Sequence, residues 1–206
     1  MAGIKTNAES LIIKMKEFIF ASANKHKAEE IELALPTDYR ILIMKEAGIS
    51  IDIPEPFETL EENSKHKAQT VFELLDKDCF SEDSGLEVEA LNNEPGVNSA
   101  RYAGDERSFE KNIEKLLHNL EGMKNRSARF RTVFTLIHKG SLYQFQGTCE
   151  GIITEKPSGT SGFGYDPVFL PSDADKTFAE MTMTEKNKYS HRKKALDQMI
   201  QFLKTQ

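Results

Sequence analysis

Hydrophobic residues recur with two different spacings, and the spacing changes from one segment of the chain to the next. Short apolar runs predict buried strands at residues 16–22 and 40–44. Between them, apolar residues three or four positions apart predict a helix over residues 25–35, which ends before a proline. The order strand, helix, strand predicts a βαβ unit at the beginning of the chain.

The same alternation continues through the rest of the sequence. The further predictions are helices over residues 60–75, 108–120 and 185–204, strands over 128–138 and 141–149, an extended proline-containing segment over 51–57, and a glycine-rich loop over 158–166. Gly140 and Ser141 predict a hairpin turn, residues 151–156 can extend the sheet, and Thr184 can cap the last helix. The expected organisation is one α/β domain, residues 16–206, after an N-terminal extension of residues 1–15.

Two adjacent acids, Glu82 and Asp83, stand between the apolar pair Cys79-Phe80 and the alternating run 86–90. Because Ser84 and Gly85 follow them, the pattern predicts a strand, a tight corner that carries the acids, and a second strand. A carboxylate at a strand end can bind a hard cation or accept a proton from water. A solvated turn is the alternative, since these residue types are also typical of turns.

Residues 22–27, Ser-Ala-Asn-Lys-His-Lys, lie where a strand is expected to pass into a helix. Backbone N–H groups at a helix start, together with a hydroxyl, an amide and a lysine, suit a phosphate. The segment lacks the glycines and the Lys-Ser/Thr pair of a Walker A loop. The alternative is that Ser22 or Asn24 only caps the helix.

Two stretches in the middle of the chain carry candidate chemistry, and each has an ordinary alternative. Glu55 lies between two prolines and suits a metal ligand or a polar loop, and Lys67 follows within a predicted helix. The loop 159–167 contains glycines that allow close approach to a flat ligand, and its rings Phe163 and Tyr165 can stack on a base. A mobile surface loop is the alternative.

Near the C-terminus, Lys186 is a candidate phosphate contact. His191 and Arg192 offer hydrogen-bond donors that could reach a purine carbonyl. A histidine next to an arginine on a helix is more often surface charge than a recognition element.

Composition narrows the class of protein. The 206 residues are 38% hydrophobic and 29% charged, which is typical of a globular chain, and the net charge of −6 argues against a general nucleic-acid binder. Cys79 and Cys149 predict free buried thiols in a reducing compartment, although a disulfide stays open. No apolar run approaches the roughly 20 residues of a membrane span. We therefore expect a cytoplasmic protein with neither nucleic acid nor membrane as partner.

Six motifs occur in one order across most of the chain, and together they resemble the inosine triphosphate pyrophosphatase family. They are Ser22-x-Asn24-x-x-Lys27, Glu62-Asn63-x-x-x-Lys67-Ala68, Glu82-Asp83-Ser84-Gly85-Leu86, Pro95-Gly96-x-x-Ser99-Ala100-Arg101-Tyr102, Phe163-Gly164-Tyr165-Asp166-Pro167 and Ser190-His191-Arg192. Ala23 departs from the family pattern, in which glycine is frequent at this position, and Glu82 stands where some members have Asp.

The resemblance implies a role for each matching residue. Asp83 would be the general base and, with Glu55, a ligand of Mg²⁺, for which Mn²⁺ is a possible substitute. The remaining substrate-binding set would be Ser22, Ala23, Asn24, Lys25, His26, Lys27, Lys67 and Lys186 around the triphosphate, and Ser84, Phe163, Gly164, Tyr165, Asp166, His191 and Arg192 around the nucleoside.

The resemblance also implies the fold and the activity. The fold would be an elongated, twisted mixed β-sheet flanked by helices, with two lobes and the active site in the cleft between them, and the chain would form a homodimer. The activity would be hydrolysis of ITP, dITP or XTP to the monophosphate and pyrophosphate. Two alternatives are a related enzyme that acts on modified pyrimidine triphosphates and a nucleotide sensor without catalysis. Retention of Glu55 and Asp83 argues against the sensor, which has no use for a general base.

Overall fold

The computed structural model describes residues 15–206, so the expected N-terminal extension lies outside the described residues apart from Met15. The helices are α1 (Lys25–Ala34), α2 (Leu60–Leu75), α3 (Phe109–Asn119), α4 (Met183–Lys186) and α5 (His191–Leu203). The strands are β1 (Lys16–Phe20), β2 (Tyr39–Ile43), β3 (Cys79–Val88), β4 (Pro95–Gly96), β5 (Ser127–His138), β6 (Ser141–Ile153) and β7 (Phe169–Pro171).

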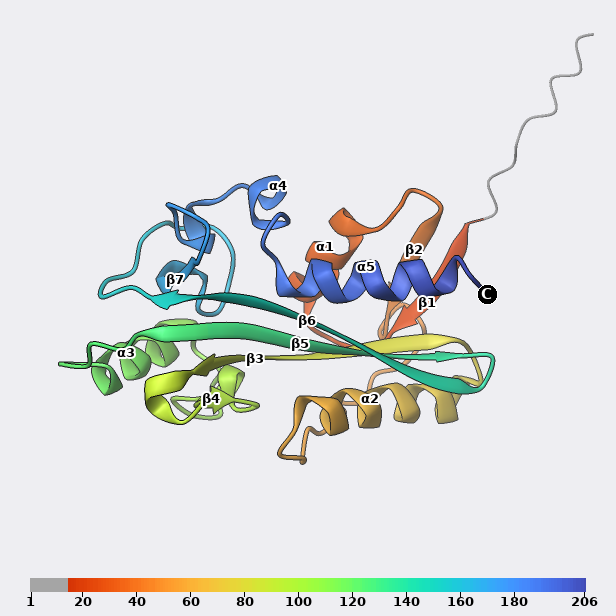
Figure 1. Cartoon of the computed structure of the whole chain (residues 1–206). Coiled ribbons are helices and arrows are strands. Elements are labelled where there is room, and N and C mark those ends of the chain that lie inside the picture. The colour runs from red at the N-terminus through yellow and green to blue at the C-terminus, as the bar shows by residue number, and fades with distance from the viewer. Residues whose placement is uncertain (1–14) are drawn as a thin grey trace, which may run out of the picture.

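One mixed sheet of seven strands organises the molecule, as the resemblance implies. Its order is β2-β1-β3-β5-β6-β7, with β4 beside β3. β1 runs parallel to β2 and β3, which gives the expected βαβ beginning, and the other pairs are antiparallel. Figure 1 shows β3, β5 and β6 running along the length of an elongated molecule, with α1 and α5 on one face and α2 on the other.

The prediction of a corner at the two acids is wrong, because β3 is one unbroken strand. Its residues pair with β5 from Cys79↔Ile137 to Val88↔Ala128, so Glu82 and Asp83 lie in the middle of a ladder. Gly85 serves close approach instead of a turn: a Cβ atom there would lie 2.4 Å from the Gly96 carbonyl oxygen of β4.

The edge of β3 that faces away from β5 is only partly covered. β1 pairs with it at Cys79 and Phe80, and β4 pairs with it at Leu86 and Glu87. Within the described chain, residues 81–85 have no strand partner on that side. The two acids therefore lie where the sheet is open along one edge.

Three clusters of buried apolar side chains surround this opening. The first joins β1, α1 and α5 and includes Phe20, Phe80 and Leu196. The second lies at the other end of the sheet, under α3 and β7, and includes Leu86. The third packs α2 against the sheet. Since Phe80 and Leu86 belong to different clusters, the acids between them lie at the boundary between two lobes.

Two other expectations about local structure need correction. The predicted C-terminal helix is two helices: Thr182 caps α4, and Ser190 caps α5 by accepting a hydrogen bond from the Lys193 N–H at 3.3 Å. Thr184 lies inside α4 and caps neither helix. The hairpin between β5 and β6 turns at Lys139 and Gly140, both with positive φ, one residue earlier than predicted. Such φ values are those of a two-residue hairpin turn.

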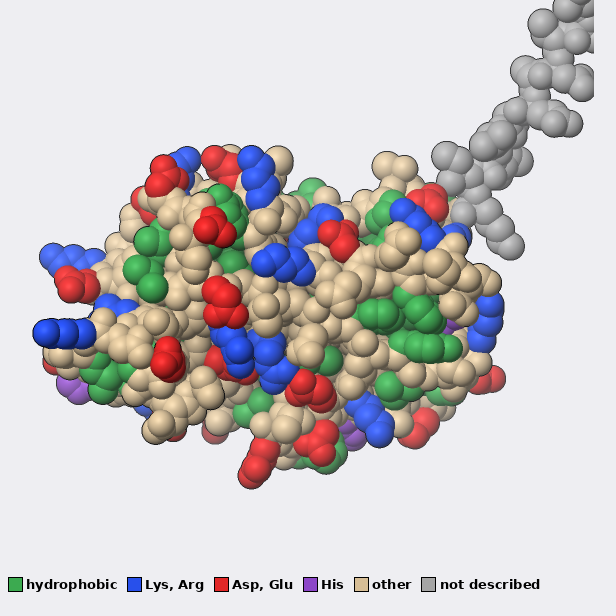
Figure 2. Space-filling view, viewed as in Figure 1, with side chains coloured by type: hydrophobic (Ala, Val, Ile, Leu, Met, Phe, Trp, Pro, Cys, Tyr) green, Lys and Arg blue, Asp and Glu red, His purple; other side chains and the backbone are tan. Residues whose placement is uncertain are grey.

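The surface drawn in Figure 2 carries acidic and basic side chains next to one another, and no single sign of charge dominates this face. From residue 15 to the C-terminus, no helix has both the length and the apolar character needed to cross a bilayer.

Candidate active site

A cavity of about 330 Å³ lies over the open edge of β3. Most of the site residues predicted from the sequence line it: Ser22, Ala23, Asn24, Lys27, Glu55, Lys67, Asp83, Ser84, Phe163, Gly164, Tyr165, Asp166, Lys186, His191 and Arg192. Lys25 and His26 do not. Lys25 is exposed on α1, and the His26 ring stacks on Phe163 at 5.2 Å between ring centroids.

The segment between β1 and α1 combines the two interpretations that the sequence left open. Asn24 is the N-cap of α1, since its Oδ1 accepts from the Lys27 N–H at 3.2 Å. Ser22 Oγ accepts from the Asn24 N–H at 3.1 Å. The capped turn still lines the cavity. The N-terminus of α1 favours negative charge there, so the turn can both cap the helix and face a phosphate.

The lysine of α1 is held by the first of the two acids. Lys27 Nζ lies 2.6 Å from Glu82 Oε1. The Thr132 hydroxyl donates to the other oxygen of Glu82 at 2.8 Å, and the Ser84 hydroxyl donates to it as well. Burial opposes ionisation of Glu82, but Lys27 and Arg192 outweigh it and hold its pKa well below the usual value. Glu82 is therefore a permanent anion that positions cations.

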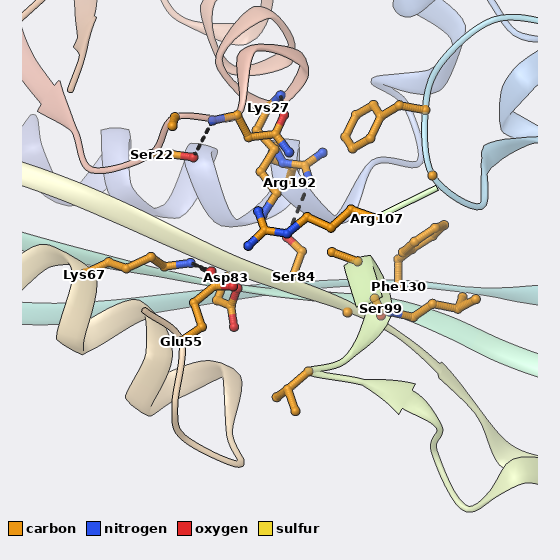
Figure 3. A pocket seen from close by; sticks show the side chains of 18 of the residues that line it. Ser22, Lys27, Glu55, Lys67, Asp83, Ser84, Ser99, Arg107, Phe130 and Arg192 are labelled. Carbon is orange, nitrogen blue, oxygen red and sulfur yellow. Dashed lines mark hydrogen bonds and ion pairs between the residues drawn. The ribbon is translucent and has the colours of Figure 1, made fainter. Parts of the chain in front are cut away.

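The second acid has a different environment on the opposite face of the sheet, since neighbouring strand residues point to opposite faces. Lys67, from α2, donates to Asp83 Oδ1 at 3.1 Å and also to Glu55 Oε1 (Figure 3). Burial raises the pKa of Asp83 to about 6, although Lys67 and Lys27 act in the opposite direction. Asp83 can therefore exchange a proton near neutral pH.

Glu55 and Lys67 stay charged beside it. Burial disfavours the Glu55 carboxylate, yet Lys67 outweighs burial and lowers the pKa of Glu55. Burial also disfavours the charge of Lys67, but Asp83 and Glu55 raise its pKa. The site thus holds one ammonium group between two carboxylates.

Those two carboxylates meet at one ammonium group, so they lie close enough together to share a hard cation. Within residues 15–206, no group of three or more His, Cys, Asp and Glu side chains forms a metal site. Mg²⁺ is commonly held by one or two carboxylates together with waters and substrate phosphates. Glu55 and Asp83 fit this pattern, because both point toward the Lys67 ammonium group from different segments.

A buried network of charge fixes the cations at the other side of the cavity. Glu30, on α1, accepts from Lys186 Nζ at 2.6 Å and from Arg192 Nη1. Lys186 also donates to Asp166 at 2.6 Å. Burial disfavours the Glu30 carboxylate, but Arg192 and Lys186 outweigh burial and lower its pKa. The motifs identified the two cations but not Glu30, the carboxylate they share.

Aromatic rings line the end of the cavity near the second lobe. His191 stacks on Phe130, with centroids 4.9 Å apart and planes within 9°. Burial, followed by Arg192 and Lys186, holds the pKa of His191 well below 6.5, so its ring is neutral. Neither ring nitrogen has a hydrogen-bond partner in the described part of the chain. A neutral imidazole offers one donor and one acceptor, so His191 can form hydrogen bonds with polar atoms on the edge of a ligand ring.

The glycine-rich loop contributes one half-buried and one buried ring. Phe163 lies between His26 and the cations Lys186 and Arg192, whose Nζ and Cζ atoms are 5.3 and 5.7 Å from its centroid. Tyr165 is buried, and its hydroxyl donates to the Ser99 carbonyl oxygen at 2.9 Å. The loop therefore packs on the protein through Tyr165 and presents Phe163 to the cavity.

A glycine on β6 allows the first turn of α5 to lie close against the sheet. A Cβ atom at Gly147 would lie 2.1 Å from the His191 carbonyl oxygen and 2.8 Å from the Ala195 nitrogen. The first turn of α5 therefore packs directly on the sheet backbone, and this contact places His191 and Arg192 in the cavity. Sequence reasoning missed Gly147, as it missed Phe130 and Arg107, which also line the cavity. Glu30 gave no signal either, because positions one and two residues away from Ile31 and Ala28 do not share their helix face.

The fold and the site define an α/β protein whose cleft combines paired lysines and carboxylates with aromatic rings. A sequence profile of the Ham1 family matches residues 18–202, and the chain belongs to this family.

Individual relatives agree with this assignment. Over 187 aligned residues, the chain is 49% identical to the dITP/XTP pyrophosphatase of Flavobacterium johnsoniae. The alignment covers 91% of this chain and 97% of that protein. The structure of this chain resembles the solved Ham1 protein of Staphylococcus aureus with a TM-score of 0.84, 39% identity, and coverage of 92% of this chain and 99% of that one. The nucleoside-triphosphatase / dITP/XTP pyrophosphatase from Mycobacterium abscessus gives a TM-score of 0.73, 33% identity, and coverage of 89% and 98%.

Proposed function

We propose that this protein hydrolyses deaminated purine nucleoside triphosphates (ITP, dITP and XTP) to the monophosphate and pyrophosphate, and so removes them from the nucleotide pool. The names of its relatives supply the substrate class. The observation that carries the chemistry is Asp83, a buried carboxylate with its pKa raised to about 6 among fixed lysines. A general base works best when its pKa lies near the operating pH.

In the proposed reaction, an Asp83 carboxylate oxygen accepts a proton from water as the water oxygen bonds to the α-phosphorus. The bond from the α-phosphorus to its bridging oxygen breaks, and that oxygen leaves with pyrophosphate. Lys27 and Lys67 offset charge on the phosphates. Neither cysteine takes part, since Cys79 and Cys149 are buried and burial raises the pKa of each thiol.

Mg²⁺, for which Mn²⁺ could substitute, would be held by Glu55 and Asp83. When bound, it would offset phosphate charge and make a coordinated water more acidic. The two carboxylate groups beside Lys67 support this assignment.

The proposed base selectivity follows from hydrogen-bond direction. Hypoxanthine and xanthine present a 6-oxo acceptor, which an N–H of His191 or Arg192 can satisfy. Adenine presents an amino donor at the same position, so a buried donor would lose its partner, and sites built on such a bond reject the wrong group strongly. Guanine shares the 6-oxo group, so discrimination against GTP has to use its 2-amino group.

The decisive experiment measures hydrolysis of ITP, XTP, dITP, ATP, GTP and a modified pyrimidine triphosphate with Mg²⁺, and separates pyrophosphate from phosphate as product. We expect pyrophosphate release from ITP, dITP and XTP, and a loss of about 100-fold or more in Asp83→Asn, the range for removing a general base. Release of phosphate would place the attack at the γ-phosphorus. Turnover of modified pyrimidine triphosphates only, or ITP binding without turnover, would favour the two alternatives.

We also propose that the chain acts as a homodimer in the cytoplasm. The family resemblance supports the dimer, and the two free buried thiols accord with a reducing compartment. Analytical ultracentrifugation should give about twice the chain mass of 23.3 kDa. A particle with the mass of one chain would contradict the dimer.

A further inference from the structure

The loop between Tyr102 and α3 brings a cation into the cavity that no motif pointed to. Arg107 lines the cavity, although its side chain is exposed at the mouth. In Figure 3 it extends from the second lobe into the cavity, away from Phe130 and toward Ser84 and Asp83. Arg107 thus reaches the cavity from the loop before α3, whereas Lys27 reaches it from α1.

The loop is tied down on both sides of Arg107. The Arg107 N–H donates to the Gly104 carbonyl oxygen at 3.3 Å, and the Ser108 side chain caps the start of α3. The buried Asn112 side chain accepts from the Ala103 N–H at 2.7 Å. Arg107 therefore projects from an anchored turn.

The backbone of Arg107 is unusual for its residue type. Its φ is +53°, in the left-handed region. Residues with a Cβ atom lose roughly 1–2 kcal/mol there, whereas Gly is comfortable and Asn is tolerated. An arginine kept in a conformation that suits a smaller residue motivates a search for what its side chain does.

Charge pairing separates Arg107 from the other cations of the cavity. Each of the other four has a carboxylate within 4.0 Å: Lys27 with Glu82, Lys67 with Glu55 and Asp83, Lys186 with Glu30 and Asp166, and Arg192 with Glu30 and Glu82. The Arg107 guanidinium makes no ion pair and no side-chain hydrogen bond with residues 15–206. A polyanion can bind Arg107 without displacing an internal carboxylate.

We propose that Arg107 binds the phosphates beyond the α-phosphate, and the pyrophosphate that leaves, and thereby fastens the second lobe over the substrate. This inference rests on the proposed function, since it takes the α-phosphate to lie at Asp83 and the base to lie near Phe130. A guanidinium presents a planar fork of donors that matches phosphate oxygens better than an ammonium does.

The test is calorimetric binding of two probes, inorganic pyrophosphate and inosine monophosphate, to the full-length protein at a fixed excess of Mg²⁺. Arg107→Asn removes the charge and suits the positive φ, so it should fold with a Tm no lower than that of the wild type. We expect its Kd for pyrophosphate to rise about tenfold, the effect of losing one charge-assisted contact, while its Kd for inosine monophosphate stays constant. Arg107→Lys should lie between it and the wild type.

Lys111→Asn is the matched control, because it removes an exposed positive charge of the same lobe that pairs outward with Glu106. It should leave both Kd values unchanged. The proposal is overturned if Arg107→Asn binds pyrophosphate like the wild type or weakens the binding of both probes equally. It is also overturned if Lys111→Asn weakens the binding of pyrophosphate as much as Arg107→Asn does. Because binding needs no turnover, the comparison stands even if no triphosphate is hydrolysed, an outcome that would overturn only the proposed function.

Discussion

Among single residues, Glu30 is the carboxylate on which two cations of the cavity depend. It is 5% exposed, and its oxygens accept from Lys186 and Arg192. Removing one partner from a buried ion pair is costly because the remaining charge has neither water nor a counter-charge.

We expect Glu30→Gln to lower the free energy of unfolding by about 3 kcal/mol, the lower end for a broken buried pair, since Lys186 keeps Asp166 and Arg192 keeps Glu82. Urea unfolding measures this change. Glu29→Gln, at the exposed neighbouring position, should change stability by less than about 0.5 kcal/mol. Equal losses in the two variants would show that the network does not hold the cations.

The buried neutral state of His191 makes stability depend on pH. Its folded pKa lies well below the ordinary value of 6.5, so below that pH the unfolded chain takes up a proton that the folded chain does not. Above about pH 6.5, His191 therefore does not reduce the free energy of unfolding. Below that pH the free energy of unfolding falls as the pH falls, by up to about 1.4 kcal/mol per pH unit.

We expect His191→Gln to flatten the loss of stability between about pH 6.5 and 5.5, where the histidine of an unfolded chain gains its proton. Unfolding curves at several pH values measure this. Asp83, with its raised pKa, contributes with the opposite sign in the same range, so the comparison uses the difference between wild type and variant. The exposed His118, replaced by Gln, is the control, and an equal slope in both variants would contradict the assignment.

Residue types and their order predicted most of the cavity lining, because lysines, acids and glycines stand in short local motifs. They did not predict Glu30 or Phe130, whose partners lie far away in the sequence. Glu30 meets Arg192, a separation of 162 residues. Only the folded chain brings such residues together, so local spacing held no information about the contact.

Among the elements, the contact between β6 and α5 positions the cations of the last helix. Gly147 leaves no room for a Cβ atom against the backbone of His191 and Ala195. Any side chain at this position has to push the first turn of α5 away from the sheet.

We expect Gly147→Ala to cost about 1–3 kcal/mol of stability, as overpacking does, and to raise the KM for the triphosphate. Gly140→Ala is the control. Gly140 has a φ of +75° and open space around it, so alanine there should lose stability through backbone strain and leave the kinetics unchanged. If the two variants lose stability alike and neither changes KM, the contact does not position the cavity residues.

The elements that sequence reasoning misplaced share one cause. Ser84 and Gly85 are typical turn residues, but pairing with β5 keeps them extended. The split between α4 and α5 depends on the Ser190 cap and on packing against β6, neither of which changes the helical spacing of apolar residues. Tertiary contacts overrode local preference at both places.

For the whole molecule, the two lobes share the strands β3, β5 and β6. The first cluster contains Leu196 and the second contains Leu116, and both are connected through the same β3–β5 ladder. A core on one side therefore has no separate sheet of its own.

We expect Leu196→Ala and Leu116→Ala each to lower the stability of one common unfolding transition, by about 2–5 kcal/mol. Calorimetry and circular dichroism should give the same Tm within each variant. Two resolved transitions, with each substitution shifting only one, would show that the lobes unfold independently.

The first core has a consequence for synthesis of the chain. It packs Phe20 and Ile31 against Leu196 and Met199, which are made much later. Domains fold from the N-terminus as they leave the ribosome, but this core lacks one side until α5 has emerged. The cavity needs both Lys27 and Arg192, so it is completed only after α5 has joined the part of the chain made long before it.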